Sequence, residues 1–220
     1  MKAIPFEALL IFLRYPEPGR VKTRLIPRLG QDGAAELYRR MAEHVLRQAR
    51  LVGRARLGCA AFVDPPERLE EARRWIGPEW AERRWPVLSQ EGGDLGRRLA
   101  AAFDWAFASG PRRAVAIGTD CLDATTQVLN GAFDALSSAD AVLGPALDGG
   151  YYLLGLSRRI PEAFRGIEWS TAGVFDATKR RLAVAGASIR ELEVLRDLDT
   201  PEDLDALLGR WGRVLGFEGI

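Results

Sequence analysis

Short apolar runs alternate with longer amphipathic stretches along the chain, and this alternation restricts the fold more than any other feature. The first run, residues 8–13, is almost uninterrupted, as expected for a central strand that is covered on both faces. The predicted strands span residues 8–13, 57–63, 85–88, 114–118, 141–143, 151–156 and 189–195. The predicted helices span residues 31–50, 66–76, 94–108, 125–136, 172–185 and 201–214. The alternation predicts an α/β fold with a mostly parallel central sheet, right-handed crossovers and helices on both faces.

One connection departs from this pattern. Only residues 145–150 separate two neighbouring apolar runs, which is too short for a helical crossover, so we expect at least one antiparallel strand there. The chain contains no internal repeat, low-complexity tract or clear linker, so we expect residues 1–220 to form a single domain. Ligands of such sheets bind beyond the carboxyl ends of the strands.

Composition limits the partners that the protein can have. Lys and Arg number 31 against 30 Asp and Glu, so the formal charge of +1 favours neither nucleic acid nor an anionic membrane. No apolar run approaches the roughly 20 residues that span a bilayer, and residues 1–7 do not resemble a signal peptide. We expect a cytoplasmic protein whose Cys59 and Cys121 are reduced thiols; the sequence leaves a homodimer open.

A basic loop, residues 14–25, directly follows the first predicted strand. Several cationic donors around one turn are what a polyphosphate requires, and a glycine permits close backbone approach to a ligand. The predicted nucleotide-phosphate site consists of Arg14, Gly19, Arg20, Lys22, Thr23 and Arg24. The alternative is a basic surface loop with turn-forming prolines, because the Gly-Lys-Thr of a Walker A loop is absent.

Acidic residues follow the strand predicted at 114–118 and also precede the last predicted helix. Asp120 lies where open α/β sheets place their ligands, and we predict it to be a ligand of Mg²⁺ or Mn²⁺. Asp197 and Asp199 alternate along an extended segment, so both point to one face and could complete the metal site. Asp123 is equally compatible with metal ligation and with capping a helix that begins near Ala124.

Residues 148–150 join an acid to paired glycines ahead of an apolar strand. Asp148 could orient or deprotonate an acceptor hydroxyl while Gly149 and Gly150 leave room for a sugar-sized group, although Asp-Gly alone is a hairpin signal. Trp169 could form an aromatic wall beside the acceptor, or it could simply pack beside a helix N-cap. His44 is the only histidine, so neither a Ser-His-Asp triad nor a multi-histidine metal site can be assembled.

Taken in order, segments 15–25, 118–121, 148–156 and 197–204 resemble the bacterial rSAM/selenodomain-associated transferases, also labelled arsenosugar-biosynthesis glycosyltransferases. The resemblance covers nearly the whole chain and implies a GT-A, Rossmann-like nucleotide-diphospho-sugar transferase fold. Two positions depart from the pattern, because Arg14 stands where the family usually has Lys and Leu122 stands where it usually has Pro.

The resemblance implies a metal-dependent glycosyltransferase with a nucleotide-diphospho-sugar donor and a small-molecule acceptor. We expect a metal on Asp120 to bridge the donor diphosphate, with Lys22 and Arg24 assisting catalysis and Asp148 acting on the acceptor. The chain is also similar, more distantly, to 2-phospholactate guanylyltransferases at residues 22–25, so nucleotidyl transfer from an NTP is the alternative. A third hypothesis is a nucleotide-binding module without catalysis.

Overall fold

A seven-stranded sheet forms the centre of the computed structural model, which describes residues 6–217. Its strands are β1 (Glu7–Arg14), β2 (Leu57–Asp64), β3 (Val87–Ser89), β4 (Arg113–Ile117), β5 (Ala141–Pro145), β6 (Tyr151–Leu156) and β7 (Ile189–Glu191), in the order β3-β2-β1-β4-β6-β5-β7. Strands β1 to β4 are parallel, whereas β6 runs antiparallel to both β4 and β5. The predicted α/β class and the antiparallel strand are therefore confirmed.

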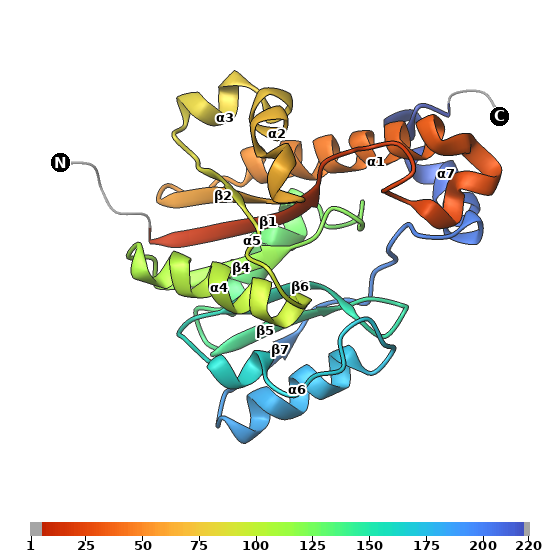
Figure 1. Ribbon diagram of the computed structural model, residues 1–220. Coiled ribbons are helices and arrows are strands. Elements are labelled where there is room, and N and C mark those ends of the chain that lie inside the picture. Colours follow the sequence, from red (N-terminus) through yellow and green to blue (C-terminus); the bar gives the residue numbers. More distant parts are fainter. Residues whose placement is uncertain (1–5, 218–220) are drawn as a thin grey trace.

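Helices cover both faces of the sheet. The α-helices are α1 (Ile26–Leu51), α2 (Leu69–Ile76), α3 (Pro78–Glu82), α4 (Leu95–Ala108), α5 (Thr126–Ala135), α6 (Val174–Val184) and α7 (Pro201–Leu215). The 3₁₀ helices are η1 (Thr23–Leu25), η2 (Pro66–Arg68) and η3 (Pro161–Phe164). Helices α1 and α4 lie on opposite sides of the sheet (Figure 1). None of the helices within residues 6–217 has the length and apolarity needed to cross a membrane; the cellular location stays a prediction.

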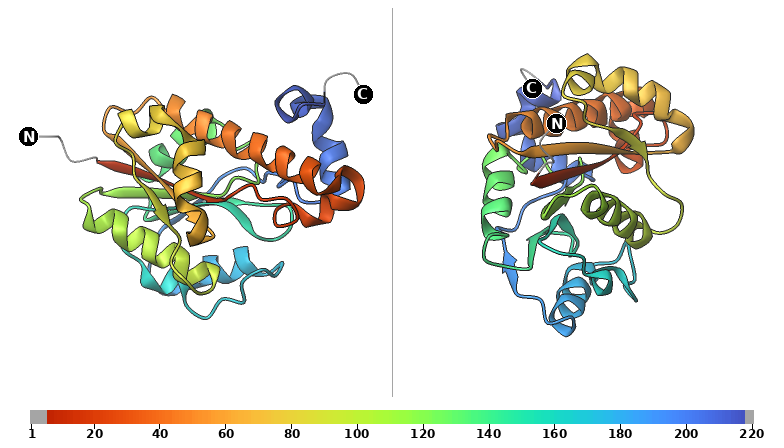
Figure 2. Two further views of the ribbon diagram at one scale, coloured as in Figure 1. Left: turned by 45° about the horizontal axis from the view of Figure 1, so that its top comes forward. Right: turned by 90° about the vertical axis from the view of Figure 1, so that its left-hand side faces the viewer.

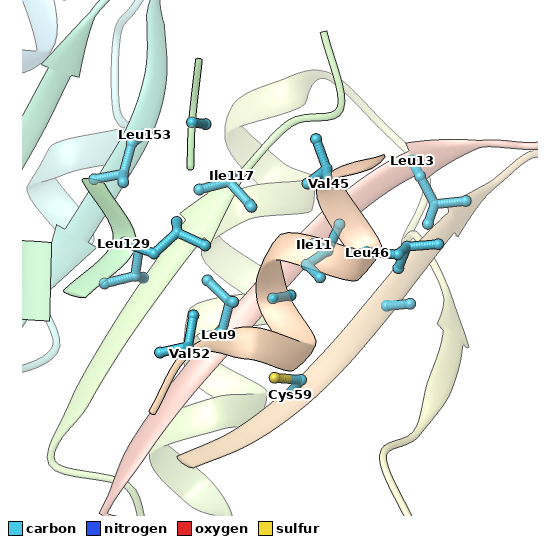
Figure 3. Packing of buried hydrophobic residues seen from close by; sticks show 14 of the residues in the cluster. Leu9, Ile11, Leu13, Val45, Leu46, Val52, Cys59, Ile117, Leu129 and Leu153 are labelled. Carbon is cyan, nitrogen blue, oxygen red and sulfur yellow. The ribbon is translucent and has the colours of Figure 1, made fainter. Parts of the chain in front are cut away.

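Strand β1 is central because it pairs with β2 on one side and β4 on the other. Its side chains alternate between two apolar layers, as the pleat of a strand requires. One layer joins Leu9, Ile11 and Leu13 of β1 to Val45 and Leu46 of α1 and Leu129 of α5 (Figure 3). The other layer joins Leu10 and Phe12 of β1 to Leu99 and Phe103 of α4. Both faces of the strand are thus dry, which explains its uninterrupted apolar sequence.

Several elements differ from their predicted bounds, and α1 and β7 differ most. Helix α1 begins at Ile26 rather than at residue 31, with a break at Gly30 (φ 72°, ψ 171°) that separates its first turn. The strand predicted over residues 189–195 is regular only at Ile189–Glu191, and Leu195 forms an isolated bridge with Ala146. Helix α3 was not predicted, because its five residues are too few to show a helical period.

A third apolar cluster lies beyond the carboxyl ends of the strands, between the start of α1 and α7. Its buried members come from four segments and include Leu25, Leu37, Met41, Leu122, Leu198, Leu204 and Leu207. Figure 2 shows α7 against the amino-terminal part of α1. Burial of Leu25, Leu122 and Leu198 brings the basic loop, the loop after β4 and the segment before α7 together. This packing positions the candidate site.

Both cysteines are free and almost fully buried, Cys59 at 3% exposure and Cys121 at 2%. Burial raises the pKa of each thiol above its ordinary value. Because the thiolate is the reactive species, we expect neither cysteine of the native protein to react with an aromatic disulfide reagent at pH 8. Both should react at once in guanidinium chloride, as absorbance of the released thiolate would record. Rapid reaction of one native thiol would contradict this expectation.

Candidate functional site

A cavity of about 840 Å³ opens at the carboxyl ends of β1 and β4. It is lined by residues from all four segments that carry the sequence resemblance. The predicted site residues on its wall are Arg14, Lys22, Thr23, Arg24, Asp120, Asp148, Gly150, Trp169, Asp197 and Asp199. The acids and the basic loop therefore meet at the carboxyl-end edge of the sheet, where open α/β folds bind their ligands.

Lys22 joins two of the acids on the wall of this cavity. Its ammonium donates hydrogen bonds to Asp120 Oδ1 at 2.5 Å and to Asp199 Oδ1 at 2.7 Å, and its side chain is only 3% exposed. Burial opposes the charge on Lys22, yet the two carboxylates raise its pKa above the usual value. Lys22 is therefore a fully charged, buried ion-pair partner of two acids that were predicted as metal ligands.

Asp197 lies in the same cavity with one carboxyl oxygen unpaired. Its Oδ1 is buried and has no hydrogen-bond partner. Burial raises the pKa of Asp197 to about 7, and the charges of Asp120, Asp148 and Asp199 add to the effect. Four carboxyl groups thus influence one small region, where the Lys22 ammonium supplies a single positive charge.

The residues fit a divalent cation by their chemistry. Carboxylate oxygens are the ligands that Mg²⁺ and Mn²⁺ prefer, and the orphaned Asp197 oxygen requires a positive partner. As the side chains stand, however, no group of three or more His, Cys, Asp or Glu residues within 6–217 is arranged to hold a metal ion. The Lys22 ammonium, rather than a shared space, lies between Asp120 and Asp199.

Tyr38 of α1 connects the ends of the two central strands, and it was not among the predicted site residues. Its hydroxyl accepts a hydrogen bond from the Arg14 N–H at 2.7 Å and lies 2.8 Å from the Thr119 hydroxyl. Burial raises the pKa of Tyr38 to about 12, so the phenol stays protonated. The sequence did not indicate Tyr38 because a tyrosine on a buried helix face is usually a core residue. Its one signal was the hydroxyl, which needs a polar partner when it is buried.

Gln90 and Arg98 form another part of the wall that the sequence did not indicate. The Gln90 amide donates to the carbonyls of Leu13 and Phe62 at 3.2 and 3.1 Å, and its oxygen accepts from Arg98 at 3.1 Å. Arg98 also pairs with Asp64 at 3.1 Å. These contacts fix the ends of β1 and β2 and place a guanidinium on the cavity wall.

The basic loop lines two neighbouring cavities. Lys22 and Arg24 face the large cavity, whereas Gly19 and Arg20 line a second cavity of about 280 Å³. Arg14 and Thr23 border both. Arg20 is 3.6 Å from Glu17, and Arg14 is 3.7 Å from Asp64. Gly19 adopts φ 77° and serves the turn of the loop.

Asp123 does not cap a helix, so that interpretation was wrong. The N-cap of α5 is Thr125. The Asp123 carboxylate instead accepts a hydrogen bond from Trp211 Nε1 at 3.1 Å and forms an ion pair with Arg210 at 2.8 Å. His44 packs edge-on against Trp211, with ring centroids 4.9 Å apart. Asp123 therefore ties the loop after β4 to α7. The sequence could not indicate this, because the partners are about ninety positions away.

The turn at residues 148–150 has a structural role beside its place at the cavity. Asp148 Oδ1 accepts a hydrogen bond from the Gly150 N–H at 2.9 Å, which confirms the turn interpretation. A Cβ on Gly149 (φ 88°) would lie 2.7 Å from the carbonyl carbon of Ala172. The missing side chain of Gly149 therefore admits the protein's own backbone rather than a sugar, which corrects the prediction. Gly150 does border the cavity.

Trp169 is both packed and part of the cavity wall. A Cβ on Gly96, in the first turn of α4, would lie 2.6 Å from Cε2 of the indole, so the ring rests directly on that turn. Leu95, 43% exposed, borders the cavity beside it. The N-cap predicted beside Trp169 is absent, because α6 begins after Gly173 without a side-chain cap.

Comparison with known proteins agrees with this architecture. A family model described as "Uncharacterized protein conserved in bacteria (DUF2064)" matches residues 46–171, which is more than half of the chain. No curated protein sequence is significantly similar.

Solved structures with this fold include one described as a proposed nucleotide-diphospho-sugar transferase from Desulfovibrio desulfuricans G20. It is 31% identical, with a TM-score of 0.81 over 96% of this chain and 97% of that chain. A CMP:2-keto-3-deoxy-manno-octonic acid synthetase complexed with CTP is 14% identical, with a TM-score of 0.58 over 94% and 99%. Rv0371c from Mycobacterium tuberculosis H37Rv, complexed with manganese, is 17% identical, with a TM-score of 0.52 over 92% and 98%. The last two show the fold alone. The chain belongs to the bacterial family DUF2064.

Proposed function

We propose that the protein is a metal-dependent glycosyltransferase that moves a sugar from a nucleotide-diphospho-sugar to a small-molecule acceptor, in the manner of the rSAM/selenodomain-associated transferases. The observation that carries the proposal is the meeting of Lys22, Asp120, Asp197 and Asp199 in one cavity at the carboxyl end of the sheet. The cavity volume, about 840 Å³, lies within the range of sites that enclose a ligand of this size. The similarity to the Desulfovibrio protein supports the same class of donor.

The roles follow from the place of each group. Asp120, Asp197 and Asp199 would hold Mg²⁺ or Mn²⁺, which when bound neutralises charge on the departing diphosphate. Arg24 is exposed on the same wall, and Lys22 is buried beside it; both direct positive charge at the phosphates. Arg14 borders the same cavity and supports the loop.

The acceptor would bind toward Asp148 and Trp169, which line the same cavity. Asp148 orients the acceptor hydroxyl and takes its proton as the new bond forms between the acceptor oxygen and the anomeric carbon. The bond from that carbon to the diphosphate breaks, and its electron pair leaves with the nucleoside diphosphate. The half-buried indole of Trp169 provides a flat surface on the cavity wall against which a sugar ring can pack.

The alternative is nucleotidyl transfer, in which a substrate phosphate or carboxylate attacks an NTP and pyrophosphate leaves. The fold shared with a synthetase that was solved with CTP favours keeping this alternative. The same basic and acidic groups would serve it, because phosphoryl-type chemistry depends on positioning and on charge neutralisation. A nucleotide-binding module without catalysis is disfavoured by the presence of all the acids proposed to hold the metal, Asp120, Asp197 and Asp199, on the wall of one cavity.

Product analysis separates these functions. The protein is incubated with Mn²⁺ and a panel of nucleotide-diphospho-sugars or NTPs, with and without candidate acceptor alcohols, and the release of nucleoside diphosphate and of pyrophosphate is measured. Glycosyl transfer predicts nucleoside diphosphate from the sugar donors and none after chelation with EDTA. Pyrophosphate from NTPs would instead establish nucleotidyl transfer. Saturable nucleotide binding with neither product would leave the non-catalytic module.

A further inference from the structure

The position of Lys22 is difficult to reconcile with a permanent role on substrate phosphates. Its ammonium is buried and donates to one oxygen of each of two acids, at 2.5 and 2.7 Å. The two acids, Asp120 and Asp199, are each 46% exposed and open to the cavity, whereas the lysine lies behind them. A phosphate in the cavity would meet the carboxylates first, and like charges repel.

The same position is difficult to reconcile with a bound metal. A divalent cation such as Mg²⁺ approaches its oxygen ligands to about 2.0–2.2 Å, and an ammonium hydrogen-bonded to the same oxygens takes that space. The arrangement explains why the acids do not form a metal-binding group as they stand. It also explains the unpartnered oxygen of Asp197. The ammonium donates its hydrogen bonds to Asp120 and Asp199 and makes none to Asp197.

We propose that Lys22 is a displaceable counter-ion: a divalent cation takes its place between Asp120 and Asp199, and the released ammonium turns into the cavity to bind the donor diphosphate. The inference rests on the proposed function, since it needs a metal and an anionic donor. Each end state gives the ammonium an anionic partner. Without ligands the single charge of Lys22 offsets part of the charge of Asp120 and Asp199; with ligands the doubly charged metal would offset more of it while the lysine pairs with phosphate.

The local structure permits such a movement. Lys22 precedes η1 with left-handed backbone angles (φ 46°, ψ 44°), which are uncommon for a residue with a side chain. The side chain is unbranched and borders the cavity beside Thr23 and Arg24, which are exposed. The ammonium therefore has to turn only about its own stem to reach the space in front of the acids.

The exchange predicts that metal and diphosphate assist each other's binding. The metal must displace an ammonium that has two charge-assisted hydrogen bonds, so it binds weakly alone. A diphosphate gives the displaced ammonium a new partner, so it lowers the cost of the exchange. Linkage requires the metal to strengthen diphosphate binding by the same factor.

The test replaces Lys22 by Met, which is also unbranched but carries no charge. Free Mn²⁺ is measured by electron paramagnetic resonance in titrations of the protein, with and without inorganic pyrophosphate as the probe for the diphosphate. We expect Lys22→Met to bind Mn²⁺ alone about tenfold more tightly than the wild type, because the competitor is gone. We also expect pyrophosphate to strengthen Mn²⁺ binding about tenfold in the wild type and much less in Lys22→Met. Lys22→Arg, which keeps the charge, should not show the gain in Mn²⁺ affinity.

The outcomes are distinguishable. Mn²⁺ affinity that is unchanged or lower in folded Lys22→Met would overturn the exchange, since removal of an ammonium that competes for the same carboxylates must raise their affinity for a cation. Pyrophosphate that strengthens Mn²⁺ binding equally in the wild type and in Lys22→Met would overturn it as well, because the released ammonium would then not be its partner. Absence of Mn²⁺ binding in the wild type and the variant, with and without pyrophosphate, would instead overturn the metal-dependent function.

If the variants do not fold, as judged by circular dichroism, a crystal structure of the wild type with Mn²⁺ and pyrophosphate decides the matter. The exchange requires Mn²⁺ between Asp120 and Asp199, with the Lys22 ammonium on pyrophosphate. An intact Lys22–Asp120 pair with Mn²⁺ bound would refute it.

Discussion

Asp120→Asn is expected to lower the proposed metal-dependent transfer by about 10²–10³-fold, because the substitution keeps the shape of the side chain and removes the charge that would hold the cation beyond the end of β4. The measurement is the initial rate of nucleoside diphosphate release with Mn²⁺ and a donor that the wild type uses. A second readout is the rise in melting temperature that Mn²⁺ causes in the wild type, which should disappear in the variant.

Asp123→Asn is the matched control, three residues further along the same loop. Its carboxylate is occupied by Trp211 and Arg210 and lies outside the cavity lining. We expect its activity to stay within about threefold of the wild type while the free energy of unfolding falls by about 1–2 kcal/mol, the usual loss for a partly buried charged hydrogen bond. A wild-type Mn²⁺ response in Asp120→Asn, or its loss in Asp123→Asn alone, would contradict the assignment of the metal to Asp120.

Gly149→Ala is expected to lower the free energy of unfolding by about 3 kcal/mol or more. The residue has φ 88°, which costs about 1–2 kcal/mol for a residue with a side chain. The new methyl group would also lie 2.7 Å from the carbonyl carbon of Ala172, so the turn and the segment before α6 would have to separate. Because Asp148 and Trp169 lie on these two segments, transfer to the acceptor should fall as well. Urea unfolding and steady-state kinetics measure the two effects.

Gly131→Ala provides the control for glycine replacement. Gly131 lies within α5, and a methyl group added to it would meet no neighbouring atom within 4 Å. An alanine there should raise the free energy of unfolding by about 0.5–1 kcal/mol, because helix interiors favour alanine over glycine. Equal stability changes in the two variants would show that the contact between Gly149 and Ala172 is not tight in solution.

Local patterns predicted the regular elements well. Strand β6 was predicted at its observed bounds, and its antiparallel direction followed from the short connection before it. The start of α7 was predicted from Thr200, Pro201 and Asp203, and the structure contains the full capping box between Thr200 and Asp203. In both cases the determining contacts are close in sequence. The end of the last predicted strand was wrong because its pairing with β5 is set by the partner, not by its own apolar residues.

In the candidate site, too, the features set by local sequence were predictable and those set by distant partners were not. Alternation of strands and helices placed Asp120 at the ligand-binding edge of the sheet and brought the four segments to one cavity. The uses of Gly149 and Asp123 were not predictable, because their partners, Ala172 and Trp211, come from distant elements.

The sequence by itself determined the class of fold, the direction of its strands and the edge of the sheet where acids and bases gather, because periodicity, turns and caps act over a few residues. Only the tertiary structure decided that the Lys22 ammonium lies between Asp120 and Asp199, 98 and 177 positions away. The physical reason is that the packing of Leu25, Leu122 and Leu198 buries the Lys22 ammonium, and a buried charge needs an oppositely charged partner beside it. Which acids become its partners depends on their distance in space, not on their separation in sequence.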